Sequence, residues 1–506
     1  MPRSANTHWV SDIKGYSDTV VPGDAPQVTD SMTNTKARFG RIEGRGGMTK
    51  YQAVSTPSTE DIIGLFNYRR VSGTHELLRL LLTKVEKFSG GVWTDVTGTA
   101  LTGTSTLRPD FTIIDDTLVF TNGKDRPRKY AGSGTTASIA AGTSPFSKNI
   151  ESYLGFLFLG NASLDGTFTD VVDGARTAFF SDDWDNDWTQ CAGNFIVLDE
   201  TPGELISMKV LGRTMFAIKS DGVVSVRFTG GATRFQQDLI SSDVGFVSGL
   251  SVKKIGEKGI LGLGNDGIIY AITLQGVEPV SYEALHKILP DTLPLNRLQF
   301  ARGLVDSEED TYYLFYDRSG LSNQLLNSYV SYNYRTREFQ KGELGKNIIA
   351  AVEFKDTDAK PEQLLLSTTT LVEEFDNGAD DDGVAITRTW TTGWQKFNET
   401  GWLHGLWAIF KRSSSARVKI DVALDHENTF HNAQVFSLAG GSPSDEHTEV
   451  EYHLPQPVFA EFINVRLRYF HDKAAAKTKL ERIGFEVRPT LRTGEKTSRS
   501  TENLVG

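Results

Sequence analysis

Residues 205–228 read LISMKVLGRTMFAIKSDGVVSVRF. Three runs rich in Val, Ile, Leu, Met and Phe are separated by the short polar segments GR (212–213) and SDG (220–222). Gly and Asp tolerate the positive φ angles of tight hairpin turns, and apolar and β-branched residues favour strands. The stretch therefore predicts three consecutive antiparallel strands, at 205–211, 214–219 and 223–228.

The same texture recurs along the chain from about residue 61. Further hairpins are predicted from 259–263 with 268–272, 311–316 with 328–333, and 364–367 with 371–375. The run at 116–121 ends in Asn122-Gly123, which predicts a two-residue turn. Sheets of three or four strands that recur about every 40 to 50 residues are what a β-propeller requires, here with divergent blades. Several separate sandwiches are the alternative.

The chain texture changes at both ends of this region. Residues 1–55 are polar with little periodicity, which predicts an extended arm, and 376–383 is acidic and Gly-rich like a linker or long loop. Beyond it the strands alternate apolar and polar residues, as in a sheet with one buried face, and this predicts a C-terminal β-sandwich. Helix is expected only as a turn or two near 282–298. The expected all-β organisation is an arm at 1–55, a propeller at 56–384, a sandwich at 385–490 and a polar tail at 491–506.

Composition limits the functional classes. The 506 residues include 53 Lys and Arg against 64 Asp and Glu, and the net charge of −11 argues against a protein that grips nucleic acid by neutralising phosphates. The single cysteine, Cys191, excludes an internal disulfide and a thiolate zinc site, and fits a reducing compartment. The longest apolar stretch, 154–160, is far short of the roughly 20 residues of a membrane helix. We expect a soluble protein without a signal peptide.

Two motifs come close to known binding patterns. GLGNDG at 262–267 matches the dinucleotide-binding spacing, but the strand-like IIYAI follows it where a helix should start, so the glycines predict a hairpin. HENTFH at 426–431 places its histidines five residues apart, about 140° around a helix, whereas a zinc site needs them four apart. With His447 and His453 they are interpreted as surface histidines.

Acidic residues give the remaining candidates for chemistry. The loops at 182–188 and 376–383 offer the oxygen ligands that calcium prefers but lack the EF-hand order, so solvated turns are favoured. Propellers can carry carboxylate pairs for glycoside hydrolysis. Candidates for such a pair are Asp182, Asp187, Glu308 and Glu309. Nothing sets one pair apart, and no Ser-His-Asp or Gly-x-Ser-x-Gly arrangement is evident. We therefore expect no catalytic residue, cofactor or metal site, and a protein that is not an enzyme.

Several stretches, taken in their order, resemble the tail hub, or nozzle, proteins of short-tailed, podovirus-type bacteriophages. They are GGMTKY (46–51), FTNGKDRPRKY (120–130), AFFSDDWDNDW (178–188), the paired strands at 211–223, FTGGATRF (228–235) leading to DVGFV (243–247), RLRY (466–469) and IGFEV (483–487). The similarity in arrangement extends from about residue 30 to 488. Each motif alone is weak, and their order carries the resemblance.

The resemblance implies a structural protein of the virion tail, assembled in the host cytoplasm. Its members form a homo-oligomeric, hexameric ring below a head-to-tail adaptor, hold a needle or plug and tail fibres or spikes, and let genomic DNA pass during ejection. An acidic protein agrees with this role, because a polyanion slides past it without sticking. Residues 1–55 and 376–383 are expected to make inter-subunit or adaptor contacts. The alternative is a soluble propeller lectin or glycoside hydrolase, which predicts an acidic and aromatic pocket at the propeller axis.

Overall fold

The computed structural model describes most of the chain. The described residues are 6–10, 14, 17, 31–38, 41–52, 56–166, 174–188, 194–231, 234–281, 295–318, 325–356, 361–411, 416–424, 427, 429–438, 447–471 and 479–489. Cys191 and the expected tail at 491–506 lie outside them. Within these ranges, no helix has the length and apolar character needed to cross a membrane. The chain divides into two compact units, one of which contains Arg45–Ile386.

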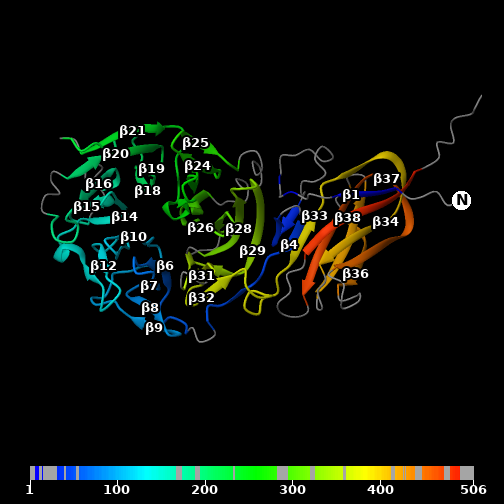
Figure 1. Ribbon diagram of the computed structural model, residues 1–506, viewed down its shortest axis with the longest axis horizontal. Helices are drawn as coiled ribbons and strands as arrows, with labels where there is room; N and C mark the ends of the chain where they lie inside the picture. Colours follow the sequence, from blue (N-terminus) through cyan, green and yellow to red (C-terminus); the bar gives the residue numbers. More distant parts are fainter. Residues whose placement is uncertain are drawn as a thin grey trace, which may run out of the picture. The chain divides into compact units, whose positions relative to one another are not determined.

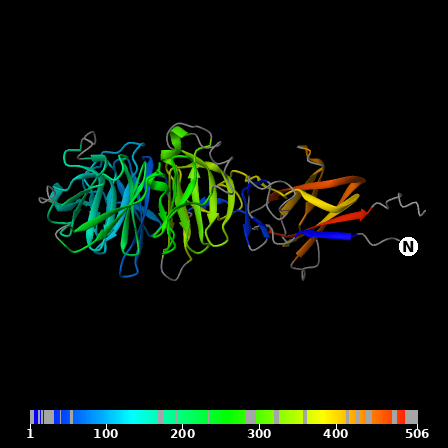
Figure 2. The ribbon, with the colours of Figure 1, turned by 90° about the horizontal axis from the view of Figure 1, so that it is seen from above.

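The unit that contains Arg45–Ile386 is built, in its described part, from seven four-stranded antiparallel sheets. Figure 1 shows these sheets as the blades of a ring, and Figure 2 shows them from the side. Blade one consists of β6 (Ile62–Arg69), β7 (His75–Leu81), β8 (Val85–Ser89) and β9 (Val92–Asp95), and blade two of β10 (Asp110–Ile114), β11 (Thr117–Thr121), β12 (Arg128–Tyr130) and β13 (Ala137–Ser138). Blade three consists of β14 (Phe146–Tyr153), β15 (Phe156–Ser163), β16 (Thr177–Ser181) and β17 (Phe195–Val197), and blade four of β18 (Leu205–Leu211), β19 (Thr214–Lys219), β20 (Val223–Phe228) and β21 (Phe235–Ser241). Blades five to seven are β22 (Lys253–Lys254), β23 (Ile260–Leu263), β24 (Ile269–Thr273), β25 (Gly276–Pro279); β26 (Arg302–Asp306), β27 (Thr311–Tyr316), β28 (Leu326–Asn333), β29 (Glu338–Ile348); and β30 (Ala350–Phe354), β31 (Gln363–Ser367), β32 (Val372–Phe375), β5 (Met48–Lys50).

The ring is closed in two ways. The first strand of each blade contacts the first strand of the next, and β30 of blade seven contacts β6 of blade one. The outermost strand of blade seven, β5, comes from the N-terminal part of the chain and pairs with β32. A closed ring hides sheet edges that a long all-β chain would otherwise expose. The β-propeller is therefore confirmed, and separate sandwiches in this region are excluded.

Apolar side chains fill the space between neighbouring blades. Between blades three and four, Phe158 and Phe235 pack edge to face with centroids 5.1 Å apart, beside the buried Met208. Between blades six and seven, Phe315 and Phe375 pack in the same way at 5.9 Å. Aromatic pairs of this geometry add about 0.5–1.5 kcal/mol to the gain from burial. The interfaces between blades are thus a continuous core around the ring.

Most of the predicted hairpins are confirmed. The decisive stretch at 205–228 forms β18, β19 and β20 with the expected limits. The two-residue turn at Asn122-Gly123 is wrong, because the next strand begins only at Arg128. Asn122 Oδ1 instead accepts hydrogen bonds from the amides of Lys124 and Asp125 and shapes a longer connection. The tight turn of this blade lies before β11 and joins it to β10, whereas Asn122-Gly123 follows β11.

The second unit contains the C-terminal sequence. Its strands are β1 (Asn6–Val10), β2 (Ser31–Thr33), β3 (Thr35–Arg38), β4 (Arg41–Gly44), β33 (Arg388–Thr391), β34 (Gln395–Lys411), β35 (Ala416–Leu424), β36 (His431–Ser437), β37 (His447–His471) and β38 (Lys479–Pro489). They form one ten-stranded hydrogen-bonded sheet. The long β37 pairs with β34 along its first part and with β33 and β35 along its last, so the sheet folds into two layers. The expected β-sandwich is confirmed.

The expected arm at 1–55 is divided between the two units. Strand β2 pairs with β33, and β4 pairs with both β3 and β38, while β5 belongs to blade seven. The described strands of this segment are three to five residues long, and such short strands carry no readable periodicity. Three short 3-10 helices are η1 (Ile139–Gly142), η4 (Gly249–Ser251) and η5 (Leu295–Phe300). Of the turn expected at 282–298, residues 282–294 lie outside the described part.

Candidate functional site

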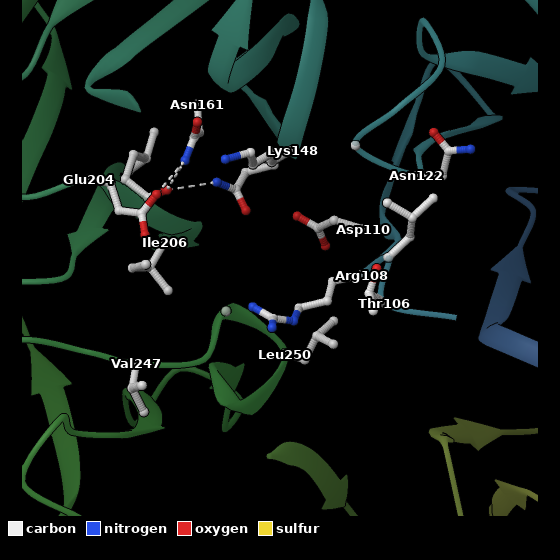
Figure 3. A pocket seen from close by; sticks show the side chains of 15 residues that line it. Thr106, Arg108, Asp110, Asn122, Lys148, Asn161, Glu204, Ile206, Val247 and Leu250 are labelled. Atoms are coloured by element: carbon white, nitrogen blue, oxygen red, sulfur yellow. Dashed lines mark hydrogen bonds between the residues drawn. The ribbon is translucent and has the colours of Figure 1, made fainter. Parts of the chain in front are cut away.

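A cavity of about 280 Å³ opens where blades two to five approach the propeller axis. Arg108 reaches it from the loop before β10, Asp110 from β10, and Leu250 from η4. In Figure 3, Arg108 and Asp110 extend into this space, and Asn161 and Glu204 form the wall across from them. Asn161 Nδ2 donates to Glu204 Oε2 over 3.3 Å. Polar side chains from several blades therefore converge on one space.

A second cavity of about 310 Å³ adjoins the first. It is lined by the inner strands of blades one, two, five, six and seven, and Asp110 and Leu250 line both cavities. Lys253 from β22, Arg302 from β26 and Glu353 from β30 contribute its charged side chains. We call the two spaces together the axial cavity.

One cation near the axial cavity is neutralised. The Nζ atom of Lys209 lies 3.4 Å from Glu151 Oε2 and 3.9 Å from Asp110 Oδ1. Burial opposes the charge of Lys209, but the carboxylates of Asp110 and Glu151 raise its pKa above the ordinary lysine value. Lys209 therefore stays charged and holds both carboxylates in place.

Three other cations have no carboxylate within ion-pair distance. Within the described residues, the side chains of Arg108, Lys253 and Arg302 make no ion pair. Arg302 Nη2 donates to the carbonyl of Ile63 over 3.1 Å. Arg108 lies 4.7 Å above the ring centroid of Phe300, and its buried Nε has no hydrogen-bond partner. These cations share the cavity with the carboxyl groups of Asp110, Glu204 and Glu353, which do not contact them directly.

Burial lowers the pKa values of Lys253 and Arg302. Burial, reinforced by Lys209 and Arg302 and opposed by Asp110, lowers the pKa of Lys253 to about 8. Burial and the neighbouring Arg108 lower the pKa of Arg302 to about 9. Both shifts mean that the folded protein disfavours the positive charge at this place.

Lys253 should make the protein more stable as the pH rises from about 8 to about 10.5. In that window the unfolded chain keeps the lysine proton that the folded protein has lost, so the free energy of unfolding increases with pH. Lys253→Met should make this increase smaller, most clearly between about pH 8 and 9, where the pKa of Arg302 has not yet been reached. Lys254→Met should retain the full increase, because Lys254 is the exposed neighbour on β22 and pairs with Glu257 at 2.8 Å. Urea unfolding across this pH range measures both, and an equal increase in Lys253→Met and Lys254→Met would contradict the assignment.

The acidic loop at 182–188 ties blade three to blade two. Trp184 Nε1 donates to Asp115 Oδ2 over 2.9 Å, and Asp185 Oδ2 pairs with Lys129 Nζ at 2.5 Å. Over the described residues, no group of three or more His, Cys, Asp or Glu side chains is placed to hold a metal ion. The carboxylates that could be compared with calcium ligands here have partners within the protein.

The acidic loop at 376–383 binds residues 45–47 of the N-terminal segment. Arg45 makes a bidentate ion pair with Asp381, Nη1 to Oδ1 at 2.8 Å and Nη2 to Oδ2 at 2.7 Å, and both side chains are buried. Asp376 Oδ1 accepts from the amide of Gly46, and the amide of Gly47 donates to Gly378 O over 2.9 Å. We call residues 45–47 with 376–383 the latch.

The latch decides between the two interpretations of residues 376–383. They belong to the propeller unit, which reaches to Ile386, so they are a loop of that unit and not a linker before the second unit. The carboxylates of Asp376 and Asp381 bind Gly46 and Arg45 of the same chain. The contacts expected between this loop and another subunit or an adaptor stay a prediction.

The four carboxylates considered for glycoside hydrolysis are not brought together as one set. Asp182 and Asp187 follow β16 in blade three, while Glu308 and Glu309 form the turn between β26 and β27 in blade six. Glu308 Oε1 accepts a hydrogen bond from the amide of Glu362.

Sequence reasoning missed a different carboxyl pair, Glu353 and Glu362. Burial, with the neighbouring Glu362 carboxyl, raises the pKa of Glu353 to about 8. The amide and hydroxyl of Ser307 donate to Glu353 over 2.7 and 3.1 Å. The two glutamates come together because β30 pairs with β31, and no sequence motif predicts this pairing.

The structure describes GLGNDG at 262–267 and part of HENTFH at 426–431, the two motifs that come close to known binding patterns. The glycines at 262–267 serve the β23–β24 hairpin, as expected. His431 lies on β36 with Nε2 3.2 Å from Glu427 Oε2, and His453 on β37 with Nε2 3.0 Å from Glu451 Oε1. His447 begins β37, and His426 lies outside the described residues.

No family model and no curated protein matches this chain. Among solved structures it is similar to the Pan2 WD40 domain of Neurospora crassa, with 9% identity, a TM-score of 0.39, and 66% of this chain and 95% of that chain covered. The extracellular domain of BT4673 from B. thetaiotaomicron shares 9% identity at a TM-score of 0.43, over 87% and 62% of the two chains. The designed protein Ika8 shares 9% at 0.36, over 66% and 99%. These comparisons concern the fold alone, and the strand pairing described above carries the propeller assignment.

Proposed function

We propose that this protein is a structural component of a bacteriophage tail, the hub or nozzle ring of a short-tailed phage. In this role it assembles as a hexameric ring, binds the head-to-tail adaptor on one side and the fibres, spikes or plug on the other, and surrounds the path of the ejected DNA. The proposal rests on the order of the sequence stretches that resemble this family. Three features of the molecule support a role in assembly.

The observation that best supports the proposal is that the N-terminal segment supplies strands to both units. Strands β2, β3 and β4 belong to the ten-stranded sheet, and the next strand, β5, completes blade seven. The chain therefore passes between the two units at residues 44–45 and again at 386–387. Separating the units by force would require breaking strand pairs in a blade or in the sheet. Such a connection suits a protein that must hold its shape while DNA is ejected.

The outer strands of the blades offer a surface for a second copy of the chain. Exposed apolar side chains lie on outermost strands: Val92 on β9, Phe195 on β17 and Leu239 on β21, with exposed fractions of 54%, 41% and 45%. The outer strands also carry unpaired backbone groups on their free edge. These side chains lie on three different blades, so each would add a separate contact with a second copy, and closed symmetric rings are the usual outcome for soluble homo-oligomers.

The lining of the axial cavity bears on the alternative function. A lectin or glycosidase predicts an acidic pocket with aromatic walls at the axis. The charged residues that line the axial cavity are Arg108, Lys148, Lys253, Lys254 and Arg302 with Asp110, Glu204 and Glu353, and its aromatic residues are Phe66 and Phe111. Because the cations outnumber the carboxyl groups, this lining does not match the acidic pocket that a lectin or glycosidase predicts.

Replacing Phe195 and Leu239 by Ser should weaken self-association of the full chain. Removing two exposed apolar side chains takes away hydrophobic contact area. Because the ring of Phe195 also packs on the buried Phe179, with centroids 6.0 Å apart, the thermal unfolding midpoint of the variant is measured alongside. Val71→Ser is the matched control, because Val71 is 89% exposed in the β6–β7 turn, away from the outer strands. Light scattering at increasing protein concentration should give a lower mean mass for the double variant only. Equal masses for the wild type and the double variant would refute an interface on these strands.

A further inference from the structure

We propose that the axial cavity is a binding site for a small oxyanion, a phosphate or a carboxylate, held by Arg108, Lys253 and Arg302. The cations come from three different parts of the ring: the loop before β10, β22 and β26. This inference is independent of the proposed function, because it concerns the interior of one propeller.

A confined cation is costly unless it is paired, and protein interiors normally supply the partner. Lys209 has two partners, Glu151 and Asp110. In the described part of the chain, Arg108, Lys253 and Arg302 make no ion pair, and the buried Nε of Arg108 has no acceptor. The carboxylates of Glu204 and Asp110 act on Arg108 and Lys253 only from beyond ion-pair distance. An anion bound in the cavity would give these cations a direct partner.

The cavity is open and large enough for such a ligand. Lys253 is half-buried and lines the cavity. The aliphatic stem of Lys253 passes Gly303, where an added Cβ would lie 2.9 Å from the lysine Cγ. The two parts of the cavity measure about 280 and 310 Å³, whereas one bound water needs only about 10–15 Å³.

The chemistry of the three cations selects an oxyanion. An arginine guanidinium presents a planar set of N–H donors that matches the two oxygens of a carboxylate or phosphate. A lysine adds a compact charge that can approach a third oxygen. The lowered pKa of Lys253 should rise again when an anion binds, so binding should take up protons at about pH 8 and above.

The test uses the full chain with inorganic phosphate and with citrate, each against chloride at equal ionic strength. Titration calorimetry at pH 7 should show saturable binding of at least one of the two, and the thermal unfolding midpoint should rise with its concentration. Lys253→Met should weaken the affinity about tenfold or more, the usual loss for one hydrogen bond to a charged group. The affinity of the wild type should also fall between pH 7 and 9, because Lys253 loses its positive charge and Glu353, which lines the same cavity, becomes negatively charged in this range.

Lys258→Met is the matched control, since Lys258 lies in the β22–β23 connection, lines neither part of the axial cavity and pairs with Asp310 at 3.1 Å. It should bind like the wild type. Lys253→Met without ligand should be at least as stable as the wild type, because it removes an unpaired charge, so loss of binding cannot be ascribed to misfolding. Binding of phosphate alone identifies a small tetrahedral anion, and binding of citrate alone a polycarboxylate. No saturable binding of either, or equal affinity in Lys253→Met, overturns the proposal.

Discussion

Replacing Arg45 by Met should lower the free energy of unfolding of the propeller by about 3–5 kcal/mol. The substitution keeps an unbranched side chain of similar length but leaves the buried Asp381 carboxylate without its bidentate partner. Asp381 Oδ2 would retain the amide of Gly345 as a donor at 2.7 Å. One neutral amide cannot replace a guanidinium at a buried carboxylate. Urea unfolding followed by tryptophan fluorescence measures the loss.

An exposed ion pair provides the control for this experiment. Arg318 pairs with Glu343, and both side chains are more than half exposed. Exposed pairs of this kind contribute about 0–1 kcal/mol, so Arg318→Met should change the stability little. If Arg45→Met costs no more than Arg318→Met, the latch does not hold the N-terminal segment in the way described.

Gly47→Ala should destabilise the propeller by about 3 kcal/mol or more, through overpacking against backbone. A Cβ at residue 47 would lie 1.8 Å from the carbonyl oxygen of Asp380. The obstacle is main chain of the latch and cannot rotate away as a side chain could. The amide of Met48 also donates to the carbonyl of Asp380 over 3.0 Å, so a shift of that group disturbs the start of β5.

Gly231→Ala is the matched glycine control. A Cβ there would meet nothing within 4 Å. Thermal unfolding midpoints of the two variants should therefore separate widely, with Gly231→Ala close to the wild type. A Gly47→Ala protein with an unchanged midpoint would mean that the close approach of the two segments is not needed for the fold.

The fold could be predicted from sequence wherever strands are long and their turns local. The meander at 205–228 and the hairpin of β27 with β28 follow from apolar runs and polar turn residues a few positions apart. The limit of the propeller at Ile386 is also close to the expected 384. The closure by β5 could not be predicted, because Met48 pairs with Phe375 across more than half of the chain. Three-residue strands with distant partners leave no periodic signal.

The turns, too, could be predicted only in part from the sequence. Asn122-Gly123 is a strong hairpin signal, yet the tight turn of blade two lies at Asp115 and Asp116, which adopt φ angles of 47° and 54°. Asp tolerates this left-handed region less readily than Gly but more readily than most residues. Local preference therefore identified that a turn was near, while the packing of the blade decided which residues form it.

The axial cations escaped sequence reasoning for a geometric reason. Lys253 and Lys254 are adjacent on β22 and both line the cavity, but only the placement of β22 at the axis brings them there, and Lys254 is the more exposed of the two. Arg108 and Arg302 lie far apart in sequence and carry no motif. A charged residue on the first strand of a blade becomes informative only when the blade limits are known. The acidic loops, by contrast, were visible in sequence, but their partners Arg45 and Lys129 were not.

The most direct test of the proposed role is the mass of the purified full chain, measured by light scattering on a size column over a wide range of concentration. The proposal predicts a closed hexameric ring that forms as the concentration rises, in keeping with the symmetric closure of soluble homo-oligomers. A protein that stays monomeric at every concentration and binds or cleaves neutral glycans would contradict the tail-hub role and favour the lectin or glycosidase.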